Sequence, residues 1–512
     1  MHIRPSLEEF KRLARHATVV PVWGELLADV ETPVSAFLKL DDGQHSFLLE
    51  SVAGEEKVAR FSFLGSHPRL LLTSRGRDLT ITERGDDGRL IARRAQAVTD
   101  PLDEIERLMR RFRVAPMPSL PRFYGGLVGY LGYDVVRFLE RLPAHRADPL
   151  GTPDLMLMLA DSMVIFDHAQ HKMLLVVNAL LEGHRPEHVY RQCVAQIQAM
   201  AHRLRRQAAP RHHRPTTRPR RPAGMRSNIS AAAFMRMVSR AKAHIRAGDI
   251  IQVVLSQRLE RKLSASPFDV YRALRSLNPS PYMYFLRFGS LSAVAGRRQA
   301  GLCLVGSSPE MLVRCEDGII ETRPIAGTRP RGDDDHRDDQ RIQQLLRSPK
   351  ERAEHLMLVD LGRNDLGRVA RVGSVHTPEL MVVEKYSHVM HLVSAVRALL
   401  RRDKTAFDVL RAAFPAGTVT GAPKVRAMEI IAELERDARG PYAGAVGYFS
   451  FSGNLDTCIT IRTILVKDRV ASVQAGAGIV ADSNPRREYQ ETLNKAKGML
   501  KAIELAEHGL TR

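Results

Sequence analysis

The chain has 512 residues, 44% hydrophobic and 26% charged, with a formal net charge of +20. This composition is typical of a globular protein and excludes a disordered or fibrous one, and the length supplies material for about three domains. The N-terminal segment is polar and carries acids, and no apolar stretch is long enough to cross a bilayer, so we expect neither a secretory signal nor a membrane segment. Four cysteines without CxxC spacing predict buried thiols in a reducing compartment, and hence a cytoplasmic protein.

Residues 1–205 are predicted to mix short strands, such as 47–51 and 172–177, with helices such as 101–112. A run from Arg203 to Arg221 follows, with eight arginines, three prolines and no acid. We interpret it as a solvated, extended linker. It has no aromatic residues or zinc-finger spacing, so it predicts loose attraction of polyanions but no specific nucleic-acid site.

Beyond the linker, Ser230 is expected to cap an amphipathic helix that ends at Gly248, and a strand follows over 250–256. Strands come in neighbouring runs around hairpin signals such as residues 452–454, which favours antiparallel pairing. We therefore predict an α+β fold with large antiparallel β-sheets packed as a sandwich and helices outside. The predicted organisation is an N-terminal lobe (1–205), a linker (206–226) and a C-terminal domain (227–512).

The segment PIAGTRPRG, residues 324–332, combines a Gly-Thr turn with prolines and arginines. Proline fixes φ, glycine admits a ligand to the bare backbone, and the arginines attract an anion. The same composition is also typical of a surface turn, and both interpretations stay open.

Two predicted helices begin alike, one after Ser348-Pro349 and the other after Asn484-Pro485. Each carries a Glu-x-x-Glu pair in its first two turns, which places two carboxylates on one face: Glu351 with Glu354, and Glu488 with Glu491. The ordinary interpretation is that Ser348 and Glu351 form a capping box in Ser-x-x-Glu spacing and that acidic residues complement the helix dipole. If the two helix starts face each other across a cleft, their oxygens suit Mg²⁺.

A strand over 470–480 presents Gly476 and Gly478 on one face, which indicates either tight sheet packing or close approach by a ligand. Before it, Thr460 and Arg462 alternate with isoleucines, as on an otherwise apolar strand. An arginine in that setting needs an anionic partner, and a substrate is a candidate.

Three further residues have both an ordinary and a functional interpretation. His391 lies in an apolar context that we interpret as helical, where a histidine is usually a satisfied core residue. Glu310 follows Ser-Ser-Pro at a strand start and is by default a surface acid. Thr418 lies in a Gly-rich turn before a helix, which is either an ordinary loop or an anion nest.

Taken together, these segments resemble the chorismate-utilising enzymes, and within them the large subunits of anthranilate synthases. The resemblance covers essentially the whole chain except the arginine-rich run. Seven motifs carry it, in the family's order: 324–332 (PIAGTRPRG), 354–366 (EHLMLVDLGRNDL), 387–394 (SHVMHLVS), 416–428 (AGTVTGAPKVRAM), 444–448 (GAVGY), 455–462 (LDTCITIR) and 475–479 (AGAGI).

The resemblance implies the fold of these enzymes and a lyase reaction in which chorismate and ammonia give anthranilate and pyruvate, the first committed step of tryptophan biosynthesis. It implies that Glu354 and Glu491 bind Mg²⁺ with Glu351 and Glu488 in support. Glu310 is implied as general acid for the leaving hydroxyl, His391 as the base that takes the ring proton, and Thr418 as a positioning group. The implied substrate contacts are Gly327, Thr328, Tyr442, Arg462, Gly476, Ala477 and Gly478.

Two positions distinguish reactions within the family. Aminodeoxychorismate synthases usually carry a nucleophilic lysine where this chain has Ala326. Isochorismate and salicylate synthases carry a water-activating lysine where it has Gln252. Both differences imply free ammonia as the nucleophile.

The resemblance also implies partners and regulation. This chain lacks the Gly-x-Cys-x-Gly elbow of a glutaminase, so a glutamine amidotransferase small subunit is expected to supply the ammonia, in a complex expected to be a heterotetramer. The N-terminal lobe resembles a tryptophan-sensing region, and tryptophan is expected to inhibit from a site between Ser51 and Pro281-Tyr282-Met283.

Overall fold

The computed structural model describes residues 1–52, 60–85, 90–143, 147–206, 224–294, 297–299, 301–332, 334–385 and 389–510. Most of the predicted linker, residues 207–223, lies outside this part of the chain. The first arginines of the run belong to helix α4 (Pro186–Arg205). Arg203 is anchored there, because its guanidinium donates to the carbonyl of Leu40 at 2.6 Å.

The described strands form two large sheets, in which neighbours pair antiparallel, and a separate hairpin of β15 (Leu291–Val294) and β16 (Arg297–Gln299). In sheet A, β23 (Gly421–Ala422) pairs with β13 and the remaining strands follow the order β1 (Ile3–Arg4), β2 (Val19–Leu27), β11 (Lys172–Leu180), β10 (Ser162–Asp167), β4 (Phe61–Ser66), β3 (Ser46–Glu50), β14 (Tyr282–Phe288), β17 (Leu302–Ser308), β26 (Thr463–Lys467), β27 (Val470–Ile479), β13 (Gln252–Lys262) and β12 (Arg226–Ser227).

In sheet B, β21 (His376–Lys385) pairs with β22, and the remaining strands follow the order β20 (Ile325–Pro330), β22 (Val389–Leu399), β19 (Ile319–Thr322), β18 (Met311–Glu316), β25 (Leu455–Ile459), β24 (Ala445–Ser450), β8 (Gly126–Leu131), β9 (Leu155–Ala160), β5 (Leu70–Arg75), β6 (Asp78–Arg84) and β7 (Leu90–Ala97).

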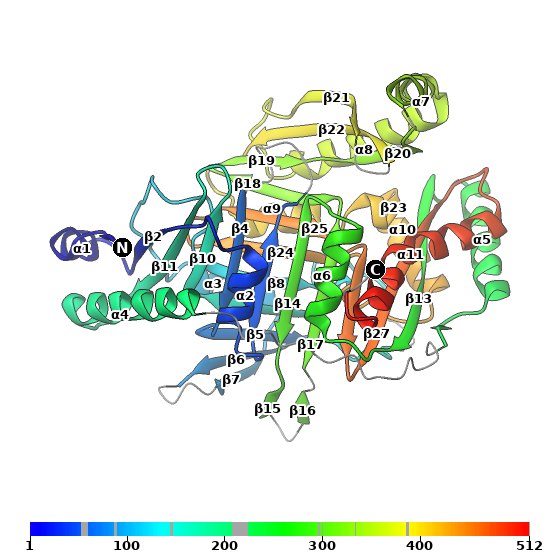
Figure 1. Ribbon diagram of the computed structural model, residues 1–512. Coiled ribbons are helices and arrows are strands. Elements are labelled where there is room, and N and C mark those ends of the chain that lie inside the picture. Colours follow the sequence, from blue (N-terminus) through cyan, green and yellow to red (C-terminus); the bar gives the residue numbers. More distant parts are fainter. Residues whose placement is uncertain are drawn as a thin grey trace.

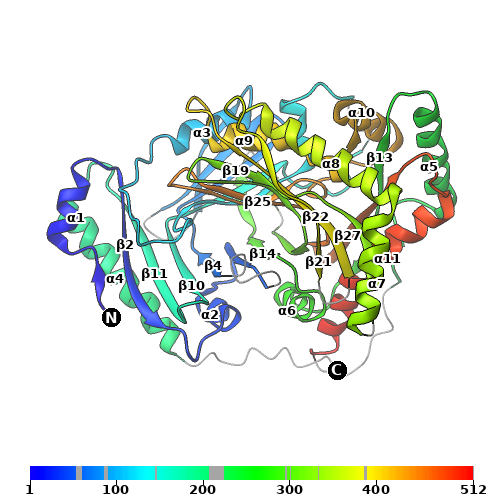
Figure 2. The ribbon, with the colours of Figure 1, turned by 90° about the horizontal axis from the view of Figure 1, so that it is seen from above.

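The helices pack outside the sheets, as predicted (Figures 1 and 2). One core lies between the sheets and holds aromatic residues such as Phe63, Tyr130 and Tyr284. A second core lies between sheet A and helices α2 (Pro33–Leu40), α4, α6 (Pro267–Leu277) and α11 (Pro485–Glu507). A third lies between sheet B and helices α3 (Pro101–Met109), α8 (Pro349–Gly367) and α9 (Ala406–Ala413). The predicted α+β sandwich is therefore confirmed as a helix–sheet–sheet–helix arrangement.

The remaining helices lie at the ends of this sandwich. In both views α1 (Leu7–Ala14) lies at one end, and α5 (Ala231–Arg246) and α11 lie at the other (Figures 1 and 2). A further core joins α5 and α10 (Lys424–Leu434) to β13 and β27. Helix α7 (Asp335–Arg347) lies beside α8 and β20, and short 3₁₀ turns η1 (Tyr133–Phe138) and η2 (Gly417–Val419) complete the described elements.

Central strands are apolar on both faces because each face meets a different core. In β14, Tyr284 and Leu286 point into the inter-sheet core, whereas Met283 and Phe285 point into the core beneath the helices. The period of two along a strand makes this division automatic. Among the helices of the described residues, none combines the length and the hydropathy needed to span a bilayer. All four cysteines are free thiols.

Both sheets run through both halves of the chain. In sheet A, β3 pairs with β14, with Glu50 opposite Met283. In sheet B, β8 pairs with β24, with Gly129 opposite Gly447. The proposed N-terminal lobe and C-terminal domain therefore share two continuous sheets, and the division at 205 and 227 remains a prediction.

Two predictions of local structure are wrong. His391 lies on strand β22, not on a helix. Arg462 is not on a strand, because β25 ends at Ile459 and β26 begins at Thr463. The chain passes from sheet B to sheet A over residues 460–462, so the alternation of polar and apolar residues reflects a crossover and not a pleat.

Candidate active site

The PIAGTRPRG segment forms the edge strand β20, and its glycine interrupts the pairing with β22. The register shifts between Ala326 and Thr328, and Gly327 has a φ of 67°. A Cβ on Gly327 would lie 3.0 Å from a carboxylate oxygen of Glu351. The bulge therefore needs glycine for its conformation and brings the strand backbone against the start of helix α8. The backbone of Thr328 lies opposite His391; its side chain is outside the described set.

His391 is held in one tautomer by this bulge. Its Nδ1 lies 3.1 Å from the carbonyl oxygen of Gly327. Because a carbonyl only accepts, Nδ1 carries the proton, and Nε2 of the neutral ring is the basic nitrogen. Burial lowers the pKa of His391, against the opposing effect of the Gly327 hydrogen bond. The ring is thus a neutral base at neutral pH.

Helix α8 confirms the predicted start, because the Ser348 hydroxyl accepts from the backbone N–H of Glu351 at 3.4 Å. Glu351 also forms an ion pair with Arg329 of β20 at 3.0 Å. Helix α11 starts as predicted at Asn484, whose side chain accepts from two backbone N–H groups. Ser348 and Asn484 therefore cap the two helices, but the predicted capping box is only half formed, because the backbone N–H of Ser348 donates to the carbonyl of Leu345 and not to Glu351.

Glu354 near the start of α8 and Glu491 near the start of α11 are close enough for their charges to interact. Burial raises the pKa of Glu354, and the negative charges of Glu351 on its own helix and of Glu491 on α11 raise it further. Glu488 behaves alike, since burial raises its pKa and the charge of Glu491 adds to the effect. Gln252 of β13 reaches Glu354 with a separation of 3.5 Å. The charges of these glutamates therefore interact, and the ammonium of Lys350 opposes the rise in pKa at both Glu354 and Glu488.

These carboxylates do not form a closed metal cage. Among the residues that the structure describes, no three acidic, histidine or cysteine side chains converge at metal-binding distance. The donor set is nevertheless chemically suited to Mg²⁺, which uses one or two carboxylates and takes its other ligands from water and substrate oxygens. The mutual repulsion around Glu354 is consistent with a cation at this position.

The glycines of β27 form a wall beside these carboxylates. A Cβ on Gly476 would lie 2.6 Å from the hydroxyl of Tyr442, and one on Gly478 would lie 2.6 Å from the amide nitrogen of Gln252. The methyl of Ala477 points to the opposite face, into the core shared with α5 and α10. Ala477 can therefore meet a ligand only through its backbone.

Arg462 lies at the crossover beside this wall, with a φ of 50°. Burial lowers its pKa, and the nearby charges of Glu491 and Tyr442 act in the opposite direction. Among the described residues no carboxylate forms an ion pair with it. A half-buried guanidinium that forms no ion pair with a described carboxylate is suited to bind the carboxylate of a ligand.

Glu310 joins β17 to β18 and is buried, at 8% exposure, so the default interpretation as a surface acid is wrong. Burial raises its pKa to about 8, with smaller opposing effects from the Thr418 hydroxyl and the Lys495 ammonium. Both Glu310 and Thr418 line a pocket between β18 and α8. Glu310 is therefore protonated at neutral pH and can donate a proton. It lies in the same pocket as Thr418 of the Gly-rich turn.

Lys495 is a site residue that the sequence did not indicate. Its ammonium forms an ion pair with Glu491 at 2.8 Å and donates to the carbonyl of Gly476 at 3.0 Å. The i, i+4 spacing of Glu491 and Lys495 was available as a signal, but it is also ordinary on helix surfaces. Its contact with the glycine wall depends on how α11 packs on β27.

The predicted effector residues also meet. Ser51, Pro281, Tyr282 and Met283 line one pocket between the two sheets, whose walls include Phe61, Phe63 and Tyr448. The Ser51 hydroxyl is buried without a hydrogen-bond partner among the described residues.

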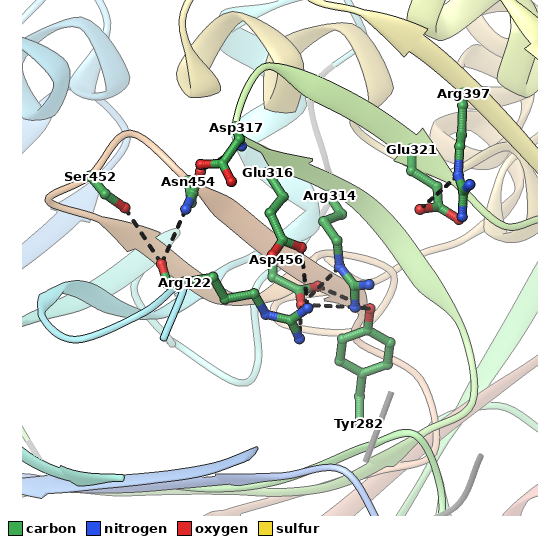
Figure 3. A network of polar contacts seen from close by, with 10 residues as sticks. All are labelled: Arg122, Tyr282, Arg314, Glu316, Asp317, Glu321, Arg397, Ser452, Asn454 and Asp456. Atoms are coloured by element: carbon green, nitrogen blue, oxygen red, sulfur yellow. Dashed lines mark hydrogen bonds and ion pairs between the residues drawn. The ribbon is translucent and has the colours of Figure 1, made fainter. Parts of the chain in front are cut away.

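Charged side chains form the polar end of this pocket (Figure 3). Asp456 accepts from the Tyr282 hydroxyl at 2.9 Å and lies 2.9 Å from the guanidinium of Arg314 and 3.2 Å from that of Arg122. Aromatic walls with both charge signs at one end suit a zwitterion with an aromatic side chain.

The chain is similar to known proteins over nearly its whole length. The model of the chorismate binding enzyme family matches residues 67–501. The chain is 48% identical to anthranilate synthase component 1 of Acetivibrio thermocellus, over 98% of this chain and 99% of that protein. It is 47% identical to the component 1 of Aquifex aeolicus, over 99% of both. The crystal structure of anthranilate synthase component I from Streptococcus pneumoniae TIGR4 superimposes with a TM-score of 0.71 at 38% identity, covering 93% of this chain and 98% of that one.

Proposed function

The chain belongs to the family of chorismate-binding enzymes, and on that basis we propose that it is the large subunit of an anthranilate synthase. It converts chorismate and ammonia to anthranilate, pyruvate and water. The observation that carries this proposal is the similarity to anthranilate synthase component 1 over the full length of both chains.

Each predicted residue has a role that its surroundings support. Arg462, Tyr442 and the backbone of Gly327, Thr328, Gly476, Ala477 and Gly478 bind and orient chorismate. Glu310 holds a proton at neutral pH and gives it to the departing ring hydroxyl, with Thr418 positioning the substrate beside it. The Nε2 atom of His391 takes the ring proton as pyruvate is eliminated.

Glu354 and Glu491 would hold Mg²⁺, with Glu351 and Glu488 in support. When bound, the ion would supply Lewis-acid stabilisation of charge on a substrate carboxylate. Gly476 and Gly478 have no side chain on the face beside these glutamates, which keeps that face of β27 free of a Cβ.

Free ammonia is the nucleophile, because Ala326 presents a methyl group where an attacking amine would otherwise stand. A glutamine amidotransferase, component II of the complex, supplies this ammonia, and the two subunits assemble as a heterotetramer in the cytoplasm. Tryptophan binds in the pocket of Ser51, Pro281, Tyr282 and Met283 and inhibits the enzyme. Residues 1–205 form a regulatory N-terminal lobe, and residues 227–512 form the catalytic domain.

The test uses the purified chain with chorismate, Mg²⁺ and ammonium at mildly alkaline pH, followed by anthranilate fluorescence. We expect anthranilate with ammonium and none with glutamine alone. Chelation should abolish the activity and added Mg²⁺ should restore it. Formation of 4-amino-4-deoxychorismate would redirect the assignment to the other aminating reaction of the family.

A further inference from the structure

A fully enclosed ion pair lies behind the candidate active site. Arg439, in the segment after α10, is 1% exposed. Its Nε and one Nη donate to both carboxylate oxygens of Glu435, at 2.8 and 2.7 Å. This bidentate arrangement fixes the plane and the direction of the guanidinium.

The remaining donors of the guanidinium bind backbone on two other elements. One Nη donates to the carbonyl of Val419 at 2.8 Å, and the other donates to the carbonyl of Val254 at 2.7 Å. Glu435 in turn accepts from the backbone N–H of Ser256 at 2.8 Å and from its hydroxyl at 3.0 Å. The pair therefore joins the η2 turn to strand β13.

Each of these anchor points adjoins a proposed substrate-binding or catalytic residue. Val419 follows Thr418 in the chain. Val254 lies opposite Gly478, and Ser256 lies opposite Gly476.

The guanidinium also contacts two aromatic rings. Its Cζ atom lies 5.5 Å from the ring centroid of Tyr442 and 4.8 Å from that of Tyr133. One side chain thus sets the relative position of the Thr418 turn, the glycine wall and the Tyr442 ring. Tyr133 and Tyr442 are themselves buried.

We propose that Arg439, oriented by Glu435, is a positioning residue for this reaction. The inference rests on the proposed function. Arg439 is enclosed by Glu435, backbone and tyrosine rings, so it acts on chorismate through its neighbours. A buried ion pair is weak evidence for stability, because desolvation offsets much of the attraction. Here its donors match three fixed acceptors in different directions, which only the planar fork of arginine provides.

The test compares Arg439→Lys and Arg439→Ala with Arg261→Lys. Arg261 is also buried on β13 and forms an ion pair with Glu507 at 2.6 Å, but none of its contacts involves a proposed site residue. Steady-state kinetics with chorismate and ammonium give kcat and KM separately. Hydrogen exchange of residues 417–422 and 252–257 reports the geometry without requiring activity.

We expect Arg439→Lys to remain folded and to lose about 100-fold in kcat, with a much smaller change in KM, because displacement of reacting groups by about 1 Å costs that much. Exchange should rise in both segments. Arg261→Lys should keep its kcat and its exchange pattern in those segments. Millimolar guanidinium should restore part of the activity of Arg439→Ala.

Equal kcat losses in Arg439→Lys and Arg261→Lys would overturn the inference, as would unchanged exchange at 417–422 in Arg439→Lys. Absence of anthranilate from the wild-type chain would count against the proposed function instead, and the exchange experiment would still decide whether Arg439 holds these segments.

Discussion

Replacing Glu310 with glutamine should raise the stability of the folded protein at neutral pH and lower its activity. In the folded protein, burial raises the pKa of Glu310 from an ordinary value of 4.5 to about 8. The folded chain therefore keeps a proton that the unfolded chain releases between these two values. For such a group the stability is fully present below the unfolded pKa and is lost as the pH rises to the folded one.

The size of the effect follows from the pKa difference. At pH 7 the pH lies about 2.5 units above the ordinary pKa of Glu310, so release of the proton stabilises the unfolded state. At roughly 1.4 kcal/mol per unit, and allowing for partial ionisation near each pKa, this stabilisation is about 3 kcal/mol. A glutamine at position 310 is neutral in both states and has no such dependence. The free energy of unfolding of Glu310→Gln, relative to that of the wild type, should therefore rise by about 3 kcal/mol between pH 4.5 and pH 7.

Denaturant unfolding of the ligand-free protein between pH 5 and pH 8 measures this difference, with anthranilate formation measured in parallel. Loss of the general acid should lower kcat by roughly 10²- to 10⁴-fold. Glu8→Gln serves as the control, because the side chain of Glu8 is 85% exposed; its stability should follow the wild type at every pH. A stability difference between Glu310→Gln and wild type that stays constant across this range would refute the reasoning, since it would show that Glu310 ionises alike in both states.

Three further predictions concern the glycine wall, the effector pocket and the linker. Gly476→Ala should unfold at a lower temperature than Gly478→Ala in a thermal unfolding experiment. The new Cβ at position 476 would meet the Tyr442 hydroxyl and the Leu255 carbonyl, whereas Gly478→Ala needs only the flexible Gln252 amide to move. A raised KM for chorismate in Gly478→Ala would indicate that the methyl group excludes the ligand. Ser51→Phe should abolish tryptophan inhibition and keep turnover, because it fills the pocket without touching Glu310 or His391; inhibition equal to wild type in an activity titration with tryptophan would count against this site. Deletion of residues 207–221 should leave kcat and KM unchanged, since no proposed active-site residue lies there; a large loss of activity would instead favour a role for the arginines in catalysis.

Local signals in the sequence were sufficient for features that depend only on residues close together in the chain. Ser348-Pro349 and Asn484-Pro485 predicted both helix starts, because capping depends only on neighbouring backbone N–H groups. The alternation over 470–480 predicted β27 and the glycine face, because a strand has a period of two. Two wrong predictions arose where periodicity was ambiguous: His391 is on a strand and Arg462 is at a crossover between sheets. A third, the default interpretation of Glu310 as a surface acid, was wrong because burial depends on tertiary packing.

The amino-acid sequence by itself therefore predicted the family and the sandwich of antiparallel sheets, and it supplied candidate site residues, because motifs and periodicity are local properties. The tertiary structure alone decided that the charges of Glu354 and Glu491 interact, that Glu310 is buried enough to keep its proton, and that Lys495 and Arg439 contact the backbone beside the glycine wall. Burial and electrostatic coupling depend on distances between residues far apart in the chain, and these distances exist only after the sheets and helices pack.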